Sequence, residues 1–371
     1  MNIGKIAELR IGDLIAKLPI IQGGMGVGVS LSGLASAVAN QGGIGVIAAA
    51  GIGMLEYDGS SNYLEANLRA LRNEIRKARK LTQGIIGVNI MVALSNFAEL
   101  VKTSVEEGVD AIFSGAGLPL NLPEYLGKSS RTKLIPIVSS AKAATLLIKK
   151  WAGKYNYIPD AFVVEGPKAG GHLGFKPEQI NDPECALEKI VVDVVNSVKP
   201  FEDEFGKPIP IIAGGGIYTG EDMYNIMKLG AAGVQMATRF VTTEECDASI
   251  GFKNAYIHAS EEDIGIIKSP VGLPGRVIVN DFIHSVNAGN KTPFHCPYHC
   301  ITTCEYKNSP YCIALALINA KKGNLKNGFA FAGANAFKAS EILPVGEVCD
   351  FIKNEYMQAA VSDPEKAAYN N

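Results

Sequence analysis

Eight short runs of apolar, β-branched residues recur along residues 19–236, and they alternate with segments of helical periodicity. The runs are Pro19–Gln22, Gly45–Ala48, Ile85–Ile90, Ala111–Phe113, Leu134–Ser139, Ala161–Glu165, Ile209–Ala213 and Gly233–Met236. The clearest helix is expected over Tyr63–Leu81, where Leu64, Leu68, Leu71, Ile75 and Ala78 fall on one face. Fully apolar strands that alternate with amphipathic helices indicate parallel βαβ units.

Eight such units within about 240 residues predict an α/β fold of the (β/α)8 TIM-barrel type. An open doubly wound sheet has fewer strands, usually five or six. We therefore expect residues 1–242 to form the barrel, 243–327 to form an added cap or lid, and 328–371 to form a C-terminal helical segment that closes the barrel. In a barrel of this type the functional residues lie at the carboxyl ends of the strands.

Charge and composition point to small-molecule partners. The formal net charge is -2, from 35 Lys and Arg against 37 Asp and Glu, so the sequence lacks the excess of basic residues typical of nucleic-acid-binding proteins. The uncharged stretch 18–55 is interrupted by polar residues and glycines, so we expect buried strands there and no membrane span. The first residues do not follow a signal-peptide pattern, and we expect a cytoplasmic protein.

Two glycine-rich strand ends are candidates for ligand binding. Gly214–Gly216, followed by a helix at 220–229 and by Gln235–Thr238, has the layout of a barrel phosphate site, although three glycines can also serve tight strand–helix packing. His172 lies among glycines after Glu165, where a histidine can act as a general acid or base near neutral pH. A structural hydrogen bond within a loop would also account for His172.

Four segments, in this order, resemble the nitronate monooxygenase (2-nitropropane dioxygenase) family, whose relatives include the flavin-type enoyl-ACP reductases: Ile20–Met25, Gly87–Asn89, Ala169–His172 and Gly233–Phe240. The resemblance implies bound FMN and implies that His172 is the catalytic base. It also implies a set of FMN-binding residues, namely Gln22, Gly23, Gly24, Met25, Asn89, Glu165, Gly170, Gly171, Gly215, Gly216, Gln235, Met236, Ala237 and Thr238.

Two positions depart from the family pattern. Ala237 stands where the family usually has glycine, which adds a methyl group beside the expected phosphate. Glu165 stands where the monooxygenases often have glutamine. A carboxylate near the flavin disfavours an anionic reduced flavin or requires a cationic partner, for which Lys168 is the candidate.

A cluster of cysteines in the expected cap lies outside the family pattern. Cys296, Cys300, Cys304 and Cys312 have the spacing C-x3-C-x3-C-x7-C. If Pro297 starts a helix, the first three share one face, and Cys312 completes a four-thiolate set. Thiolates at this density suit an iron–sulfur cluster or zinc, with His295 or His299 able to replace one thiolate of a zinc site. Free buried cysteines would also give this pattern.

The resemblance thus implies an FMN-dependent oxidoreductase that oxidises a small carbon acid such as an alkyl nitronate, with His172 as acid/base. An NAD(P)H-dependent ene or enoyl-thioester (enoyl-ACP) reductase is the second possibility, to which an iron–sulfur cluster would offer an electron route. A non-redox isomerase or lyase whose phosphate site binds the substrate also stays open, as does a metal-bound scaffold without turnover. The sequence leaves the substrate, the electron acceptor, the metal and a homo-oligomeric state open.

Overall fold

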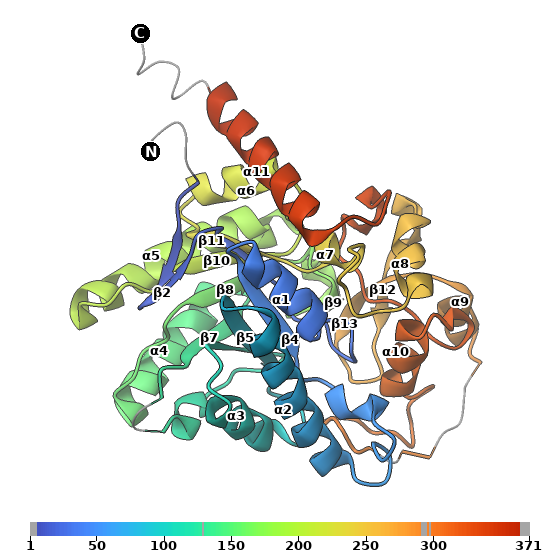
Figure 1. Ribbon diagram of the computed structural model, residues 1–371. Coiled ribbons are helices and arrows are strands. Elements are labelled where there is room, and N and C mark those ends of the chain that lie inside the picture. The colour runs from blue at the N-terminus through green and yellow to red at the C-terminus, as the bar shows by residue number, and fades with distance from the viewer. Residues whose placement is uncertain (1–5, 128–129, 291–294, 297, 364–371) are drawn as a thin grey trace.

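The chain folds around a closed barrel of eight parallel strands. The computed structural model describes residues 6–127, 130–290, 295–296 and 298–363. Around the barrel the strand order is β10-β11-β3-β4-β5-β6-β7-β8 (Figure 1). The strands are β3 (Ile20–Gln22), β4 (Ile44–Ala48), β5 (Ile85–Met91), β6 (Ala111–Gly115), β7 (Lys133–Val138), β8 (Phe162–Glu165), β10 (Ile211–Gly214) and β11 (Gly233–Met236). Each overlaps one of the eight runs expected from the sequence, so the predicted TIM barrel is confirmed.

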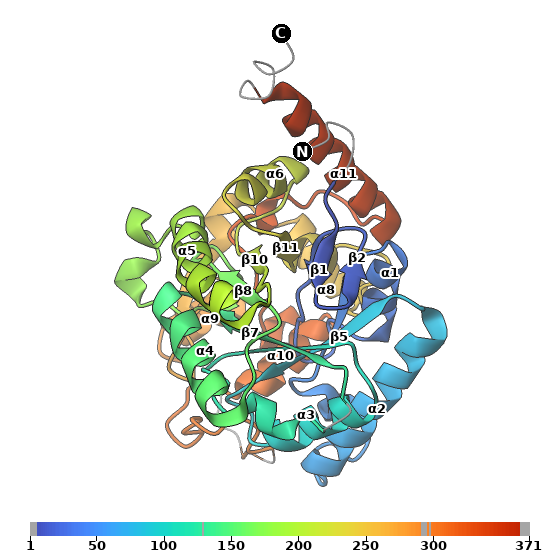
Figure 2. The same cartoon turned by 90° about the vertical axis from the view of Figure 1, so that its left-hand side faces the viewer.

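Helices surround the strands, as the view in Figure 2 shows for α2 to α6. They are α1 (Ser32–Asn40), α2 (Tyr63–Leu81), α3 (Phe97–Glu106), α4 (Ala141–Tyr155), α5 (Leu187–Phe205), α6 (Gly220–Lys228) and the short α7 (Thr238–Val241). Helix α2 has the expected bounds and buries Leu71, Ile75 and Ala78 against the barrel. Leu64 lies at its first turn and remains 40% exposed, because the apolar face contacts the barrel only further along the helix.

A short N-terminal hairpin, which the sequence did not predict, packs against the barrel interior. Its strands are β1 (Leu9–Ile11) and β2 (Leu14–Ala16). Leu9 and Ile11 are buried in the same cluster as the inward-facing Phe113 and Ile135. Since these side chains fill the inside of the barrel, the barrel is a packed core and not a pore.

The cap contains helices and a small sheet that also includes a short strand following barrel strand β8. Its elements are α8 (Ile250–Ile257), β12 (Ile264–Lys268), β13 (Pro274–Ile278), α9 (Asp281–Asn287) and α10 (Ile313–Lys321), and Figure 1 shows α8, α9 and α10 gathered on one side of the barrel. Strand β13 pairs with both β12 and β9 (Gly171–His172), which follows β8. The division at 242/243 and 327/328 stays a prediction, and this pairing joins the first two parts at the barrel mouth.

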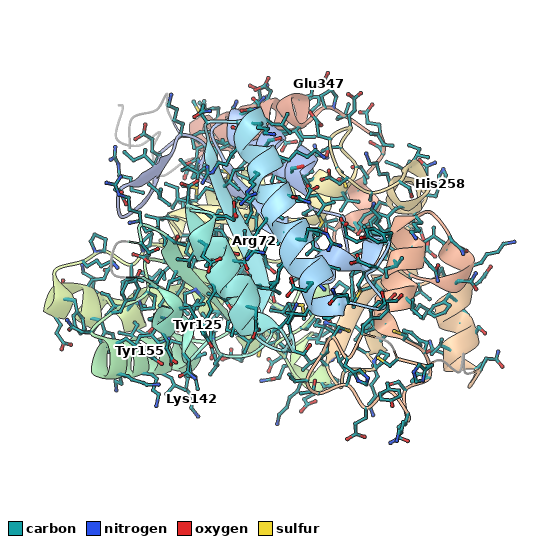
Figure 3. All side chains as sticks on the ribbon, turned by 60° about the horizontal axis from the view of Figure 1, so that its bottom comes forward. Arg72, Tyr125, Lys142, Tyr155, His258 and Glu347 are labelled. Atoms are coloured by element: carbon teal, nitrogen blue, oxygen red, sulfur yellow. The ribbon has the colours of Figure 1, made fainter. Side chains whose placement is uncertain are left out.

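The C-terminal part ends in α11 (Val345–Ser362), which packs against α6 and α1. The remaining helices are short 3-10 turns: η1 (Ile52–Leu55), η2 (Leu122–Tyr125), η3 (Pro177–Gln179), η4 (Pro183–Cys185), η5 (Glu261–Asp263), η6 (Leu325–Asn327) and η7 (Ala336–Lys338). Polar side chains such as Arg72, Lys142 and Glu347 cover the outer faces of the helices (Figure 3). Within the described ranges no helix has both the length and the apolar character that crossing a membrane requires.

Candidate active site

A cavity of about 890 Å3 opens at the carboxyl ends of the barrel strands. Nearly all the residues expected to bind FMN line it, together with His172. They are Gly23, Gly24, Met25, Asn89, Glu165, Gly170, Gly171, Gly215, Gly216, Gln235, Met236, Ala237 and Thr238. These residues come from several different strand ends, so the fold assembles one site from segments that are far apart in the sequence. A cavity of this size falls in the range of small-molecule and cofactor sites.

Gln22 is the exception, because its side chain points into the protein and does not line the cavity. It is fully buried, donates to Ser30 Oγ at 3.0 Å and accepts a hydrogen bond from the Val46 backbone amide at 3.1 Å. The Ser30 hydroxyl in turn accepts from the backbone amide of Met25 at 3.0 Å. Gln22 therefore fixes the turn that carries Gly23 and Met25, and the structure gives it no contact surface in the cavity.

Glycine is required at three points of the wall by close approach of other groups. A Cβ atom at Gly24 would lie 2.5 Å from Asn89 Cβ, and one at Gly170 would lie 2.6 Å from the backbone of Ala332 and Gly333. Gly215 has φ +97°, and a Cβ there would lie 2.9 Å from the carbonyl oxygen of Gly166. The wall is therefore bare backbone in these segments, and a flat ring or a phosphate can approach its amide groups closely.

Several polar groups face this bare backbone. No hydrogen bond joins the side-chain amides of Asn89 or Gln235 to another described residue, which leaves their donors and acceptors for a ligand. The Thr238 hydroxyl accepts from the Gly333 amide at 2.9 Å and keeps its own proton to donate. A Cβ atom added at Gly23 would lie 3.2 Å from the methyl carbon of Ala237, so this methyl group packs against the glycine turn.

His172 lies on β9 at the edge of the cavity. Its Nε2 is 2.8 Å from Ser269 Oγ, and its ring makes an edge contact with Phe331 at a centroid distance of 5.0 Å. Ser269 is 3% exposed and lies in the turn between β12 and β13. Burial lowers the pKa of His172 to about 4, so the imidazole is neutral at physiological pH. A neutral imidazole held at the cavity wall can accept a proton from a bound substrate.

Glu165 lies at the end of β8 and also lines the cavity. Burial raises the pKa of its carboxyl group to about 7. None of the ion pairs between described residues includes Glu165, so Lys168 is not the cationic partner that the sequence suggested. A carboxyl group that titrates near neutral pH can avoid placing a negative charge beside the flavin by holding a proton.

We expect Glu165→Gln to stabilise the flavin-free protein more at pH 8 than at pH 5. The folded pKa of about 7 lies above the ordinary value of 4.5, so the folded state holds a proton that the unfolded state releases between these values. The stability that Glu165 contributes is therefore present below pH 4.5 and is lost as the pH rises through 7. The gain from Gln should grow by about 2 kcal/mol from pH 5 to pH 8, as measured by urea unfolding.

The exposed Glu204→Gln is the matched control for this experiment, because its side chain lies in solvent at the end of α5. It should change the unfolding free energy equally at both pH values. An equal change for Glu165→Gln would mean that burial does not raise the pKa of that carboxyl group.

The cysteine segment is not helical, so the helix expected from Pro297 onward is wrong for the described residues. Pro297 itself lies outside them, and residues 298–312 form turns, bends and one isolated bridge between Ile301 and Leu94. The backbone of this segment pairs with the loop after β5 instead, through the amide of Thr302 on the carbonyl of Ala93 and the amide of Ser95 on the carbonyl of Cys300. These bonds to another loop satisfy backbone groups that a helix would pair internally.

The four cysteines of this segment nevertheless share one small cavity, of about 270 Å3. Burial raises the pKa of Cys300 to about 12, and the neighbouring Cys312, Cys296 and Cys304 raise it as well. Among the described residues, no three His, Cys, Asp or Glu side chains converge closely enough to hold a single metal ion. His295 is exposed and does not line the cavity, whereas His299 does.

Three residues at the site were not found from the sequence. Ser269 and Arg276 come from the cap, and Arg276 donates to the carbonyls of Pro167 (2.9 Å) and Ala169 (3.3 Å), which holds the loop before His172. Asn335 donates from Nδ2 to the carbonyl of Gly216 at 2.6 Å and supports the glycine turn. A lone serine, arginine or asparagine carries no local pattern, and only the pairing of β9 with β13 brings the first two to the site.

The residues present fit FMN. The backbone at Gly170 and Gly215 lies too close to its neighbours for any side chain, and the amides of Asn89 and Gln235 face the same cavity. Exposed backbone amides suit a phosphate, and side-chain amides suit the polar edge of the flavin ring. The cavity volume of about 890 Å3 leaves room for a second small molecule beside the cofactor.

Two solved structures share the fold over most of their length. FabK from Thermotoga maritima superposes with a TM-score of 0.72 and 29% sequence identity, covering 95% of this chain and 96% of FabK. A nitroalkane oxidase from Streptomyces ansochromogenes superposes with a TM-score of 0.70 over 93% of this chain and 97% of its own. At 22% identity, that second likeness concerns the fold alone.

Sequence comparisons point to one family. A probable nitronate monooxygenase of Staphylococcus aureus is 30% identical over 311 residues, covering 74% of this chain and 79% of the relative. One from Staphylococcus saprophyticus is 28% identical over 309 residues, covering 76% of this chain and 81% of the relative. The family model described as nitronate monooxygenase matches residues 9–355, nearly the whole chain. The resemblance seen in the four strand-end segments is thereby confirmed, and the chain belongs to the nitronate monooxygenase family of flavin-dependent oxidoreductases.

Proposed function

We propose that the chain is an FMN-dependent oxidoreductase that oxidises a small carbon acid of the nitroalkane or nitronate class, with His172 as the base. The observation that carries this proposal is the imidazole of His172, held by Ser269 at the edge of a cavity whose glycine-rich walls suit a flavin. Gly23–Met25, Asn89, Gly170, Gly215 and Gln235–Thr238 would hold FMN. When bound, FMN supplies the electron transfer that no side chain can perform.

His172 is arranged to take a proton from the carbon acid. When Nε2 donates to Ser269 Oγ, Nδ1 keeps its lone pair and can accept the α-proton of a neutral nitroalkane. The C–H bond breaks, the electron pair remains on the substrate as the nitronate anion, and His172 becomes an imidazolium. The anion then lies beside the new positive charge, which stabilises both. Ser269 keeps the ring oriented throughout.

A second candidate function is the NAD(P)H-dependent reduction of an enoyl thioester. It is favoured by the likeness to FabK, an enoyl-ACP reductase, at 29% identity over 95% of this chain. In that reaction His172 would deliver a proton to the substrate rather than remove one. The non-redox isomerase or lyase considered from the sequence is disfavoured, because the chain belongs to a family of oxidoreductases.

An anaerobic titration of the FMN-loaded protein distinguishes the two candidates. We expect the oxidised flavin absorption to bleach on addition of a nitronate, such as that of 2-nitropropane, and to persist with NADH or NADPH. Because the absorption of the bound flavin is followed directly, the assay requires no electron acceptor. Bleaching by a nicotinamide with no response to the nitronate would overturn the first proposal in favour of the reductase.

A further inference from the structure

The cap holds a second cavity, of about 270 Å3, whose wall contains Cys296, Cys300, Cys304 and Cys312. The rest of the wall is formed by His299, Ile301, Thr302, Tyr306 and Ile313. All seven cysteines are free thiols, and the other three, Cys185, Cys246 and Cys349, do not line this cavity. Thiols buried only for packing would be scattered like these three. The gathering of four at one cavity points to a ligand that binds thiolates.

The size of the cavity that the four cysteines line favours a cluster over a single ion. Around one zinc ion, four thiolate sulfurs converge to about 2.3 Å from the metal and enclose no cavity. Such convergence is not found among the described residues, and the four cysteines line a cavity of about 270 Å3 instead. In an iron–sulfur cluster each thiolate binds an outer corner of the cluster, so the sulfurs stand apart around it. We infer that Cys296, Cys300, Cys304 and Cys312 bind an iron–sulfur cluster in this cavity.

Hydrogen-bond donors are already directed at these sulfurs. The backbone amide of His299 donates to Cys296 Sγ at 3.4 Å, and the amides of Ala314 and Leu315 at the start of α10 act on the Cys312 sulfur. The Tyr63 hydroxyl is buried without a partner among the described residues, and it lies close enough to Cys300 for the two groups to interact electrostatically. Donors around the sulfurs stabilise the negative charge of a thiolate-bound cluster.

Apolar side chains cover the same site from the barrel side. Cys300 and Cys312 pack in one cluster with Val27, Met54 and Ile318. The ring of Tyr298 packs against Tyr63 at a centroid distance of 5.9 Å. This surrounding limits the access of water to the sulfurs of Cys300 and Cys312, as the shell of a redox centre does.

The cysteine cavity adjoins the large cavity at the barrel mouth. Cys300, Ile301 and Ile313 line both. A cluster bound here would therefore be separated from the FMN cavity by the thickness of single side chains. The inference rests on the cysteines alone and does not depend on which carbon acid or thioester the barrel binds.

The test is to reconstitute the full chain anaerobically with ferrous iron and sulfide, and to measure iron, acid-labile sulfide, zinc and FMN per chain. We expect iron and sulfide in equal amounts, about four of each for a four-cysteine cubane. Broad visible absorption beneath the flavin bands should accompany them. Zinc at one per chain with no sulfide, or FMN-replete protein with neither metal, would overturn the inference. Since FMN is measured separately, a chain that does not bind flavin would be recognised by the absence of FMN, whatever its iron content.

Variants assign the ligands. Cys304→Ala and Cys312→Ala should each lower bound iron by at least about tenfold. Loss of a residue that only supports a metal ligand already lowers metal affinity by about 10–100-fold, and loss of a ligand itself costs more. Cys349→Ala is the matched control, since this thiol is fully buried in α11 and away from the cavity, and it should bind iron as the parent does. FMN content reports that each variant is folded. Unchanged iron in both cluster variants would overturn the assignment.

Discussion

The His172→Ala enzyme should oxidise a neutral nitroalkane with kcat/KM lowered by about 10²–10⁴-fold, the usual contribution of a positioned general base. The imidazole lies at the cavity edge and is neutral because burial lowers its pKa to about 4. Removing it leaves no equivalent base on β9. Steady-state oxidation of 2-nitropropane in its neutral form, with FMN content determined for each preparation, measures the loss.

The preformed nitronate is an internal control for this variant, because its α-proton is already gone. Its oxidation by His172→Ala should fall far less than that of the neutral acid. His258→Ala, a change at an exposed position on the outer surface (Figure 3), should affect neither substrate. Equal losses for both forms of the substrate would mean that His172 binds or orients the substrate and does not remove its proton.

The same assignment fixes the pH dependence of the parent enzyme. Protonation of His172 removes the base, so kcat/KM for the neutral acid should fall as the pH drops through about 4. Ser269→Ala removes the hydrogen bond to Nε2 and should move this midpoint while retaining measurable activity. A midpoint that does not respond to Ser269→Ala would contradict the role of Ser269 in holding the ring.

Gly170→Ala is expected to weaken FMN binding by about 10–100-fold. The new methyl group would lie 2.6 Å from the backbone of Ala332 and Gly333, and backbone cannot move aside as a side chain can. Overpacking of this kind costs about 1–3 kcal/mol, and the loop must shift away from the cavity to relieve it. If FMN binding has to reverse this shift of the cavity wall, each 1.4 kcal/mol of the cost weakens FMN affinity by about tenfold. Fluorescence titration of the flavin-free protein with FMN measures it.

Gly153→Ala is the matched control for this substitution. Gly153 lies in α4 with nothing within 4 Å of its Cβ position, so alanine should stabilise the helix by about 0.5–1 kcal/mol and leave FMN affinity unchanged. FMN binding by Gly170→Ala at the parent's affinity would show that the loop accommodates the methyl group without moving the cavity wall.

The barrel could be predicted from the sequence because each of its strands is buried on both faces. Runs such as 85–88 and 161–164 are therefore continuously apolar, which sets them apart from the amphipathic helices between them. Site residues at strand ends, such as Asn89 and Gly215, follow directly from the strand positions, since the carboxyl ends of parallel strands meet at one face. The positions of these residues can therefore be predicted without knowledge of side-chain contacts.

The remaining errors arose where long-range contacts override local pattern. Gln22 ends a strand like the other site residues, but its amide satisfies groups on Ser30 and Val46, which only the folded chain brings near it. The i, i+4 spacing of the first three cluster cysteines suggested a helix, yet their segment hydrogen-bonds to the loop after β5. The two residues of β9 are too few to show strand periodicity, and their partner strand lies about a hundred residues later.

The pairing of β9 with β13 has a consequence for how this protein can diverge. The proposed base, His172, is carried by β9, whose partner strand β13 belongs to the cap, and the loop before it is held by Arg276 of that cap. Exchanging the cap for one of another shape would therefore change not only which substrates enter but also where the imidazole points. A different cap would therefore redirect His172 while Gly23, Asn89 and Gly215 keep their places at the ends of barrel strands.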